Sequence, residues 1–378
     1  MRLRQAIVVI FLAALLPLVA KGDDAKKLAD AAKRLEAGRL APKLDKERVL
    51  ALLQGEPSGT AKEPALEAKD DQEATRKALE LFARPAGEFP FRLVEKERRK
   101  SSVRHEVRFL SGVHTTDESD VVTGFYYEPL TSDSAPRREG NKLPGCVVVH
   151  HLGGSMEAEE MLAQYLTNHG VASMTIALPG YGERRSKNAP KGGFLGHKDP
   201  VDDLAGFRQA ILDVRRAADF LRTRPEIDPE RVGVCGISLG ALVSSDAAGI
   251  DARFARAVFV IGGGDFTKVL LGDSKEAREQ GKHLREANIS PEELKQAFDL
   301  VDPNTFAHRL RSDDVLMLNA EKDEIFPRES TEGLWRRAGY PRIKWYDTDH
   351  KGVVAHLGDV MTETLAHLKG KAEKREPD

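Results

Sequence analysis

Cysteine is nearly absent from this sequence, whose 378 residues hold only Cys146 and Cys235. Two cysteines cannot form a disulfide framework, and no cysteines or histidines recur at the spacing of a metal site. Both cysteines fall in stretches predicted to be core strands. We therefore expect buried free thiols, with a single disulfide as the alternative, and we expect neither a metal nor a cofactor.

An excess of charge of one sign is missing as well. Lys and Arg number 58 and Asp and Glu number 60, so the formal net charge is −2. Nucleic acids and anionic membranes are bound through concentrated basic patches, so we expect no nucleic-acid partner. Hydrophobic residues make up 40% and charged residues 31%, which indicates a soluble globular chain.

The apolar run near the start of the chain is too short to cross a membrane. Residues 6–20 would span about 22 Å as a helix, against roughly 30 Å of hydrocarbon. Arg2 and Arg4 precede the run, Pro17 lies near its end, and the small Gly22 follows it. We therefore predict a cleavable signal over residues 1–22, a secreted or periplasmic protein, and no stable membrane insertion after cleavage. An uncleaved anchor is the alternative.

Residues 23–99 are predicted to form a helical extension without candidate catalytic residues. Helical periodicity covers residues 24–55, turn formers and charges without periodicity indicate a mobile linker over residues 56–71, and a short helix is expected over residues 72–83. Strands and helices alternate from residue 100 to residue 370, where the main domain is expected.

Apolar strands separated by helices fill residues 100–370. Strands with apolar residues throughout are buried on both faces, and helices between them act as crossovers of a parallel sheet. We predict a doubly wound, mostly parallel sheet of eight strands. A charged, partly helical segment at residues 262–302 interrupts the series and is expected to form a small lid insertion.

A single G-x-S-x-G pattern occurs at Gly236–Gly240, between an apolar strand and a predicted helix. In this pattern the serine lies on a sharp strand-to-helix turn, which carries strain of about 1–3 kcal/mol and lifts the hydroxyl clear of the sheet. Glycines two residues away avoid collisions. The pattern predicts Ser238 as a nucleophile, with an incidental glycine-rich turn as the alternative.

Several segments around this pattern together resemble one branch of a known superfamily. The turn at Gly236–Gly240 is called the nucleophile elbow, and I-D-P-E-R-V-G precedes it at residues 227–233. The other segments are L-P-G-Y-G-E-R at 178–184, D-P-N-T-F-A at 302–307 and N-A-E-K-D-E-I-F-P at 319–327. Over residues 100–368 the chain resembles α/β hydrolases of the dienelactone hydrolase, acetyl xylan esterase and prolyl-oligopeptidase-like branch. The resemblance implies the α/β-hydrolase fold and a Ser-His-Asp triad.

The resemblance places the base of the triad at His350. In this fold the chain order is serine, acid, histidine, and His350 follows the last predicted strand. A serine hydroxyl becomes a good nucleophile when such an imidazole takes its proton. His356 and His367 lie within the final predicted helix and are expected to sit away from the elbow.

The resemblance places the acid at Asp323. Its loop is similar to the family's G-x-x-D-x-x-x-P pattern, with Ala320 in place of the usual glycine. The carboxylate would fix the imidazole tautomer and stabilise the imidazolium. Glu321 and Glu324 are rivals in the same loop.

Two backbone N–H groups are expected to bind the developing oxyanion. The first is that of Leu239, directly after the nucleophile. The second is that of Leu152, because residues 150–155 resemble the family's H-G-x-x-G loop. The match departs at His151, where glycine is usual, and a plain strand-helix turn is the alternative.

These residues together predict a secreted serine hydrolase that cleaves carboxylic esters of small molecules or glycans through an acyl-enzyme. A peptidase similar to prolyl oligopeptidase is one alternative, although such family members usually carry a propeller domain that the upstream segment cannot supply. A binding protein with this fold and no turnover is another. Such proteins generally lose a triad member, whereas this chain has all three.

Overall fold

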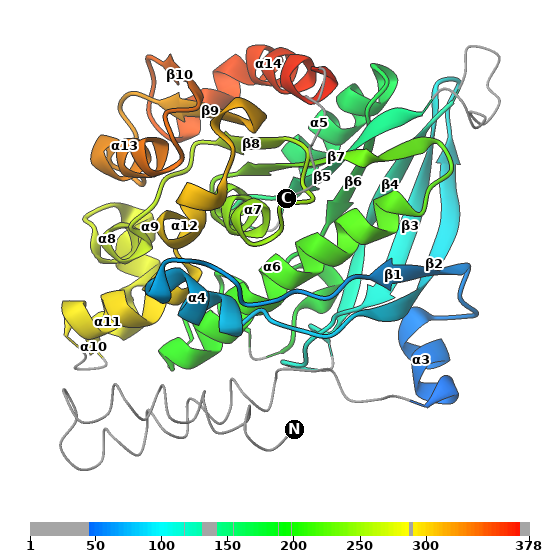
Figure 1. Ribbon diagram of the computed structural model, residues 1–378, viewed down its shortest axis with the longest axis horizontal. Helices are drawn as coiled ribbons and strands as arrows, with labels where there is room; N and C mark the ends of the chain where they lie inside the picture. Colours follow the sequence, from blue (N-terminus) through cyan, green and yellow to red (C-terminus); the bar gives the residue numbers. More distant parts are fainter. Residues whose placement is uncertain are drawn as a thin grey trace.

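A ten-stranded mixed sheet runs through the middle of the molecule, with helices on both of its faces (Figure 1). The structure is a computed structural model, and it describes residues 45–370 except residues 117, 131–141, 154, 188, 198 and 287–289. The predicted signal at residues 1–22 and the helix predicted before residue 45 lie outside the described residues. None of the helices within the described ranges is both long and apolar enough to cross a membrane.

The strands follow one another along the chain as β1 (Gly59–Glu63), β2 (Gly87–Arg98), β3 (Ser102–Leu110), β4 (Val121–Pro129), β5 (Leu143–Val149), β6 (Ala172–Ile176), β7 (Ile227–Ile237), β8 (Ala257–Val260), β9 (Val315–Ala320) and β10 (Arg342–Tyr346). The α-helices of the described residues are α3 (Lys46–Leu53), α4 (Glu73–Glu80), α5 (Glu157–Asn168), α6 (Pro200–Arg222), α7 (Leu239–Ile250), α8 (Phe266–Leu271), α9 (Lys275–Gln280), α10 (Lys282–Glu286), α11 (Pro291–Phe298), α12 (Pro303–Phe306), α13 (Arg328–Arg337) and α14 (Leu357–Lys369).

The sheet order is β1-β2-β3-β4-β6-β5-β7-β8-β9-β10. Strands β5 to β10 pair in parallel with one another, and β1 to β4 join them as an antiparallel flank. The prediction of a doubly wound, mostly parallel sheet is therefore confirmed. The predicted count of eight strands is wrong, because the sheet has ten.

The two additional strands come from the segment predicted to be a helical extension with a linker. Strand β1 lies inside the predicted linker at residues 56–71 and pairs with β2 in register from Gly59↔Phe91 to Glu63↔Gly87. The sequence of β1 gave no sign of a strand, because the side chains that it buries are Ala61 and the charged Glu63. The helix predicted at residues 72–83 is present as α4.

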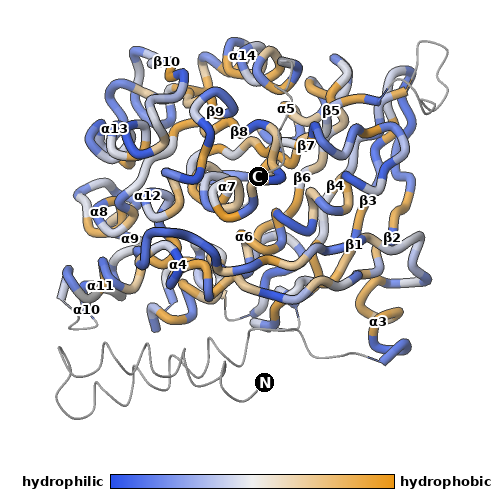
Figure 2. The backbone as a smooth tube through the Cα atoms, viewed as in Figure 1, coloured by the Kyte–Doolittle hydropathy of each residue, from blue (hydrophilic) through white to orange (hydrophobic). Residues whose placement is uncertain are grey.

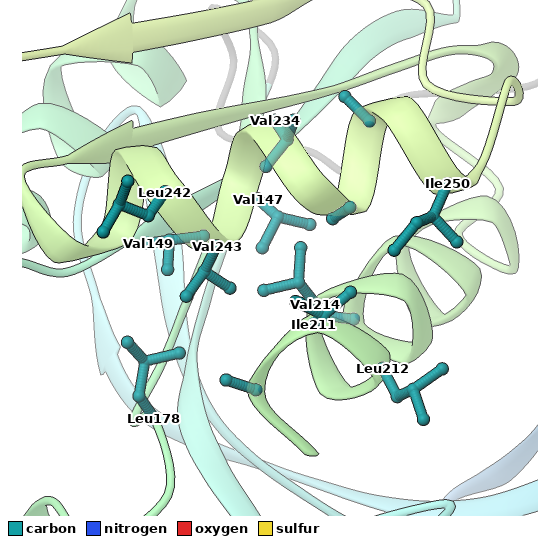
Figure 3. Packing of buried hydrophobic residues seen from close by; sticks show 14 of the residues in the cluster. Val147, Val149, Leu178, Ile211, Leu212, Val214, Val234, Leu242, Val243 and Ile250 are labelled. Atoms are coloured by element: carbon teal, nitrogen blue, oxygen red, sulfur yellow. The ribbon is translucent and has the colours of Figure 1, made fainter. Parts of the chain in front are cut away.

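Two hydrophobic cores lie on the two faces of the sheet. Helices α6 and α7 cover the larger one, whose packing Figure 3 shows around Val147, Val214 and Val243. Helices α5 and α14 cover the other core. Hydrophobic stretches accordingly follow the central strands and α7 (Figure 2). Cys146 and Cys235 are buried free thiols in the second core, as predicted, and burial raises the pKa of both.

A buried ion network fastens β1 to the main domain. Glu63 accepts from Arg84 at 2.8 Å and from Arg216 of α6 at 2.6 Å. The same guanidinium groups donate to the carbonyls of Gly112 and Leu110, at 2.8 and 2.6 Å. Burial alone would raise the pKa of Glu63, but the two cations hold it below its usual value. Strands β1 and β2, which precede residue 100, are therefore an integral part of the sheet.

Replacing Glu63 should destabilise the whole domain. We expect Glu63→Gln to lower the free energy of unfolding by about 3–5 kcal/mol, because it leaves the buried guanidinium of Arg84 and the partly buried one of Arg216 without their carboxylate. Urea denaturation would measure the loss. Glu97→Gln is the matched control, since Glu97 forms an exposed pair with Arg99 and its removal should leave the midpoint unchanged. If both variants lowered the free energy of unfolding by the same small amount, the stabilising role of the Glu63 network would be contradicted.

Helix α7 buries an acid, Asp246, whose side chain is fully shielded from solvent. Neither carboxyl oxygen has a hydrogen-bond partner within the part of the chain that the structure describes. Burial, and then the nearby carboxyl of Asp302, raise the pKa of Asp246 well above its usual value. The native side chain is therefore protonated at pH values where an unfolded Asp, with a pKa of about 3.9, is ionised.

This shift predicts a pH dependence of stability. Below pH about 4 both states hold the proton, and above it only the unfolded state releases it. The free energy of unfolding therefore falls as pH rises, until the native carboxyl also ionises. Asp246→Asn removes this loss, so its stability relative to wild type should increase from about pH 5 to about pH 8. Parallel denaturation midpoints of both proteins across that range would refute the prediction.

Candidate active site

The predicted site residues gather at one edge of the sheet. Strands β5 to β10 are parallel, so all of their carboxyl ends lie at this edge, where open α/β sheets bind ligands. Ser238 follows β7, Asp323 follows β9 and His350 follows β10. The three residues come from loops far apart in the sequence, and the parallel topology brings them together.

Ser238 has the strained backbone that the elbow pattern predicts, with φ 55° and ψ −113°. Its N–H donates to the carbonyl of Val260 at 2.9 Å, which holds the turn against β8. The flanking glycines are sterically required. A Cβ atom at Gly236 would lie 2.0 Å from the carbonyl oxygen of Gly240, and one at Gly240 would lie 2.2 Å from that of Val149.

His350 links the serine to the acid. Its Nε2 lies 2.9 Å from Ser238 Oγ, and its Nδ1 lies 2.8 Å from Asp323 Oδ2. Asp323 Oδ1 accepts the N–H groups of Ile325 and Phe326, at 2.9 and 2.8 Å, which orient the carboxylate. Because a carboxylate only accepts, the imidazole proton lies on Nδ1, and Nε2 can accept the serine proton.

Three of the rival candidates for the acid and the base have other contacts. Glu324 accepts the backbone N–H of His350 at 3.1 Å and so holds the histidine loop, a contact that the sequence did not predict. His356 packs on Tyr346, with ring centroids 4.9 Å apart. His367 hydrogen-bonds the carbonyl of Asp314 at 3.0 Å. The hydrogen-bonded row therefore consists of Ser238, His350 and Asp323.

The two N–H groups predicted to bind an oxyanion lie on adjoining segments. Leu239 is the first residue of α7, and Leu152 lies in the loop after β5. Gly240 sits directly against the end of β5, as its close approach to the carbonyls of Val149 and His150 shows. Neither N–H has a hydrogen-bond acceptor among the described residues. The N–H of Leu239 directly follows Ser238 in the chain, at the start of α7.

A second strained residue lies beside the serine. Ile261 follows β8 and has φ 46°, which is rare for a β-branched side chain. The register Ile237↔Val260 makes it the lateral neighbour of Ser238. The next carbonyl, that of Gly262, accepts from Asn319 at 2.8 Å and from Thr331 at 3.1 Å, which pins the turn. Strain of this kind persists where the surroundings over-determine it, and it clusters at functional sites.

The predicted lid insertion at residues 262–302 folds into helices α8 to α11. Lys351, directly after His350, forms an ion pair of 2.8 Å with Glu276 of α9. Hydrogen bonding to Lys351 is the main cause that lowers the pKa of Glu276. The insertion therefore lies beside the histidine loop.

A cavity of about 770 Å³ is lined by other residues than the hydrogen-bonded row. Its walls are the β3–β4 loop, residues 179–197 and the first half of α6, and they do not include Ser238 or His350. Arg184, near these walls, is fully buried and donates to Asp213 at 2.6 Å and to the carbonyl of Ala177 at 2.7 Å. Its role is structural, since it fastens the loop after β6 to α6.

Comparison with known proteins gives matches over much of the chain. Solved structures of acetyl xylan esterases from Paenibacillus and Thermoanaerobacterium superpose with TM-scores of 0.61 and 0.60, at 20% and 18% identity. They cover 88% and 89% of this chain and 98% of their own. An acylaminoacyl peptidase from Pyrococcus horikoshii superposes with a TM-score of 0.53 at 17% identity, over 78% of this chain and 47% of its own. These likenesses confirm the predicted α/β-hydrolase fold.

Curated relatives match a shorter part of the chain. An uncharacterized protein of Mycobacterium tuberculosis is 29% identical over 191 residues, which are 48% of this chain and 43% of that protein. The chain thus spans about two fifths of the length of this relative.

The acetyl xylan esterase (AXE1) family matches residues 128–351, well over half of the sequence. The match contains all three residues of the hydrogen-bonded row, and it agrees with the branch that the sequence motifs resemble. The chain therefore belongs to the acetyl xylan esterase family of α/β-hydrolase-fold ester hydrolases.

Proposed function

We propose that this protein hydrolyses carboxylic esters of small molecules or glycans through an acyl-enzyme on Ser238. The observation that carries the proposal is the hydrogen-bonded row from Ser238 through His350 to Asp323, with distances of 2.9 and 2.8 Å. Family membership supports an ester substrate. Two of the structural neighbours are acetyl xylan esterases, so acetyl esters of xylan are the first substrates to test.

In the first half-reaction Ser238 attacks the ester carbonyl carbon while His350 Nε2 takes the hydroxyl proton. Negative charge moves to the carbonyl oxygen, which the N–H groups of Leu239 and Leu152 stabilise. The carbon–oxygen bond to the alcohol then breaks, and the imidazolium gives its proton to the departing oxygen. Asp323 keeps the imidazole oriented and stabilises its positive form.

The second half-reaction repeats these roles with water. His350 takes a proton from a water molecule as its oxygen attacks the acyl carbon on Ser238. Collapse of the second tetrahedral intermediate breaks the bond to Oγ, and the proton returns from Nε2 to the serine. The products are the carboxylic acid and the free enzyme.

The same proposal includes export and a covering role for the insertion. The predicted signal at residues 1–22 would place the enzyme outside the cytoplasm, where glycan esters are accessible. Helices α8 to α11 would cover the substrate, because the Glu276–Lys351 pair keeps them beside the His350 loop.

Ser238→Ala should abolish ester hydrolysis. We expect kcat on p-nitrophenyl acetate to fall by roughly 10⁴-fold or more, and labelling by a fluorophosphonate to disappear, because no other nucleophile lies on the elbow. Thermal unfolding should stay unchanged. More than about a hundredth of wild-type activity in a folded variant would assign the nucleophile elsewhere. Cleavage of a prolyl anilide in preference to the ester would favour a peptidase.

Asp323→Asn should be far more damaging than Glu324→Gln. The amide can donate to Nδ1 and so favour the wrong imidazole tautomer, and we expect kcat to fall by about 10⁴-fold. Glu324 accepts the backbone N–H of His350, and a glutamine oxygen can still accept it. The kcat of Glu324→Gln should therefore fall by less than about 10-fold. Steady-state kinetics of both variants test the assignment. Similar losses would mean that Asp323 does not set the tautomer alone.

A further inference from the structure

The loop after β5 differs from the family pattern at His151, and at this position it is tied to a buried acid. Glu159 Oε1 accepts the backbone N–H of His151 at 3.1 Å and also lies 2.8 Å from His151 Nδ1. Glu159 is fully buried in the first turn of α5, while the His151 ring is partly exposed. One carboxylate oxygen thus holds both the main chain and the side chain of His151.

The carbonyl of His151 is held as well, by the side chain of His150. Its Nε2 accepts the N–H of Leu178 at 3.0 Å, so the imidazole proton must lie on Nδ1, which donates to the carbonyl of His151 at 2.7 Å. The ring is completely buried, and burial lowers its pKa, so it stays neutral and keeps this tautomer. His150 and Glu159 therefore fix the carbonyl and the N–H of one residue.

These contacts determine where the next N–H points. In a trans peptide the C=O of one residue and the N–H of the next point in opposite directions. The His151 carbonyl points toward His150, so the Leu152 N–H points away from it. Gly153 has φ 122°, which lets the chain turn directly after this peptide.

We propose that Glu159, acting through His151, is a positioning residue for the Leu152 oxyanion donor. This inference rests on the proposed function, because it assumes a tetrahedral oxyanion formed at Ser238. Glu159 touches no reacting atom. It holds the His151–Leu152 peptide in place, where a glycine at position 151 would leave more freedom to the chain.

A purely structural role explains the same contacts less well. An acid in the first turn of a helix normally caps that helix by accepting the N–H just before it, here that of Met156. Glu159 instead reaches back to His151, in the loop. Its second oxygen, Oε2, is buried without a hydrogen-bond partner in the described part of the chain, which is costly. All the hydrogen bonds of this buried acid in the described part of the chain therefore go to His151 in the loop.

The first experiment compares Glu159→Ala, Glu159→Gln and the control Glu157→Ala. Glu157 lies in the same first turn but is exposed, so its removal tests the charge at the helix end alone. With a p-nitrophenyl acetate substrate we expect Glu159→Ala to lower kcat by about 10- to 10²-fold with little change in KM, because oxyanion binding acts mainly in the transition state. Glu159→Gln keeps an acceptor oxygen and should recover most of kcat. Glu157→Ala should match wild type.

A thiono ester separates positioning from general damage. Sulfur accepts hydrogen bonds weakly, so hydrolysis of a thiono ester depends less on the oxyanion donors than hydrolysis of the oxo ester. The oxo-to-thiono ratio of kcat should therefore fall in Glu159→Ala and return in Glu159→Gln. His151→Ala loses only the side-chain contact and should give a smaller fall. If Glu159→Ala does not fold, His151→Ala carries the same test.

The outcomes distinguish this inference from the proposed function. If wild type shows no hydrolysis that depends on Ser238, the proposed function fails and the inference falls with it. If Ser238-dependent hydrolysis is present but Glu159→Ala retains kcat, or loses oxo and thiono rates equally, only the positioning role is overturned. For His151→Ala, an unchanged oxo-to-thiono ratio would likewise overturn it.

Discussion

The contact between the start of α7 and the end of β5 is the constraint on which the rest of the site depends. Ser238 can keep its positive φ only if the following turn packs against the sheet, and Gly240 makes this possible by lying against the carbonyl of Val149. That contact sets the elbow beside the loop that carries Leu152. Strain at Ser238 is thus balanced by close packing, and its lateral neighbour Ile261 is strained and pinned in the same manner.

Each proposed catalytic group is in turn held by a second set of hydrogen bonds. Backbone N–H groups orient Asp323, Glu324 holds the main chain of His350, and His150 joins the loop after β5 to the loop after β6. The side chains of the row depend on three separate strand ends. Their alignment to within hydrogen-bond distance follows from a sheet whose strands all finish at one edge.

Much of this arrangement could be predicted from the sequence, because its signals are local. The elbow needs two glycines and a serine at fixed spacing, and apolar strands alternating with helices indicate a doubly wound sheet. The signals that failed were those of long-range partners. Strand β1 buries the charged Glu63, whose partners Arg84 and Arg216 lie 21 and 153 residues away in the sequence. The buried face of β1 is therefore not wholly apolar, and the alternation typical of a strand is missing. The contact of Glu324 with the main chain of His350, 26 residues away, likewise exists only after two separate loops have met.

The two faces of the sheet contribute differently to the proposed oxyanion site. Leu239 belongs to α7, which packs in the larger core, whereas Glu159 belongs to α5, which packs in the second core with Cys235 and α14. The two N–H groups can converge only if both helices keep their positions on opposite sides of one strand pair, β5 and β7. Packing changes in either core would therefore move one donor relative to the other. The site thus depends on the geometry of both cores, although all of its proposed reacting groups lie in loops at one edge of the sheet.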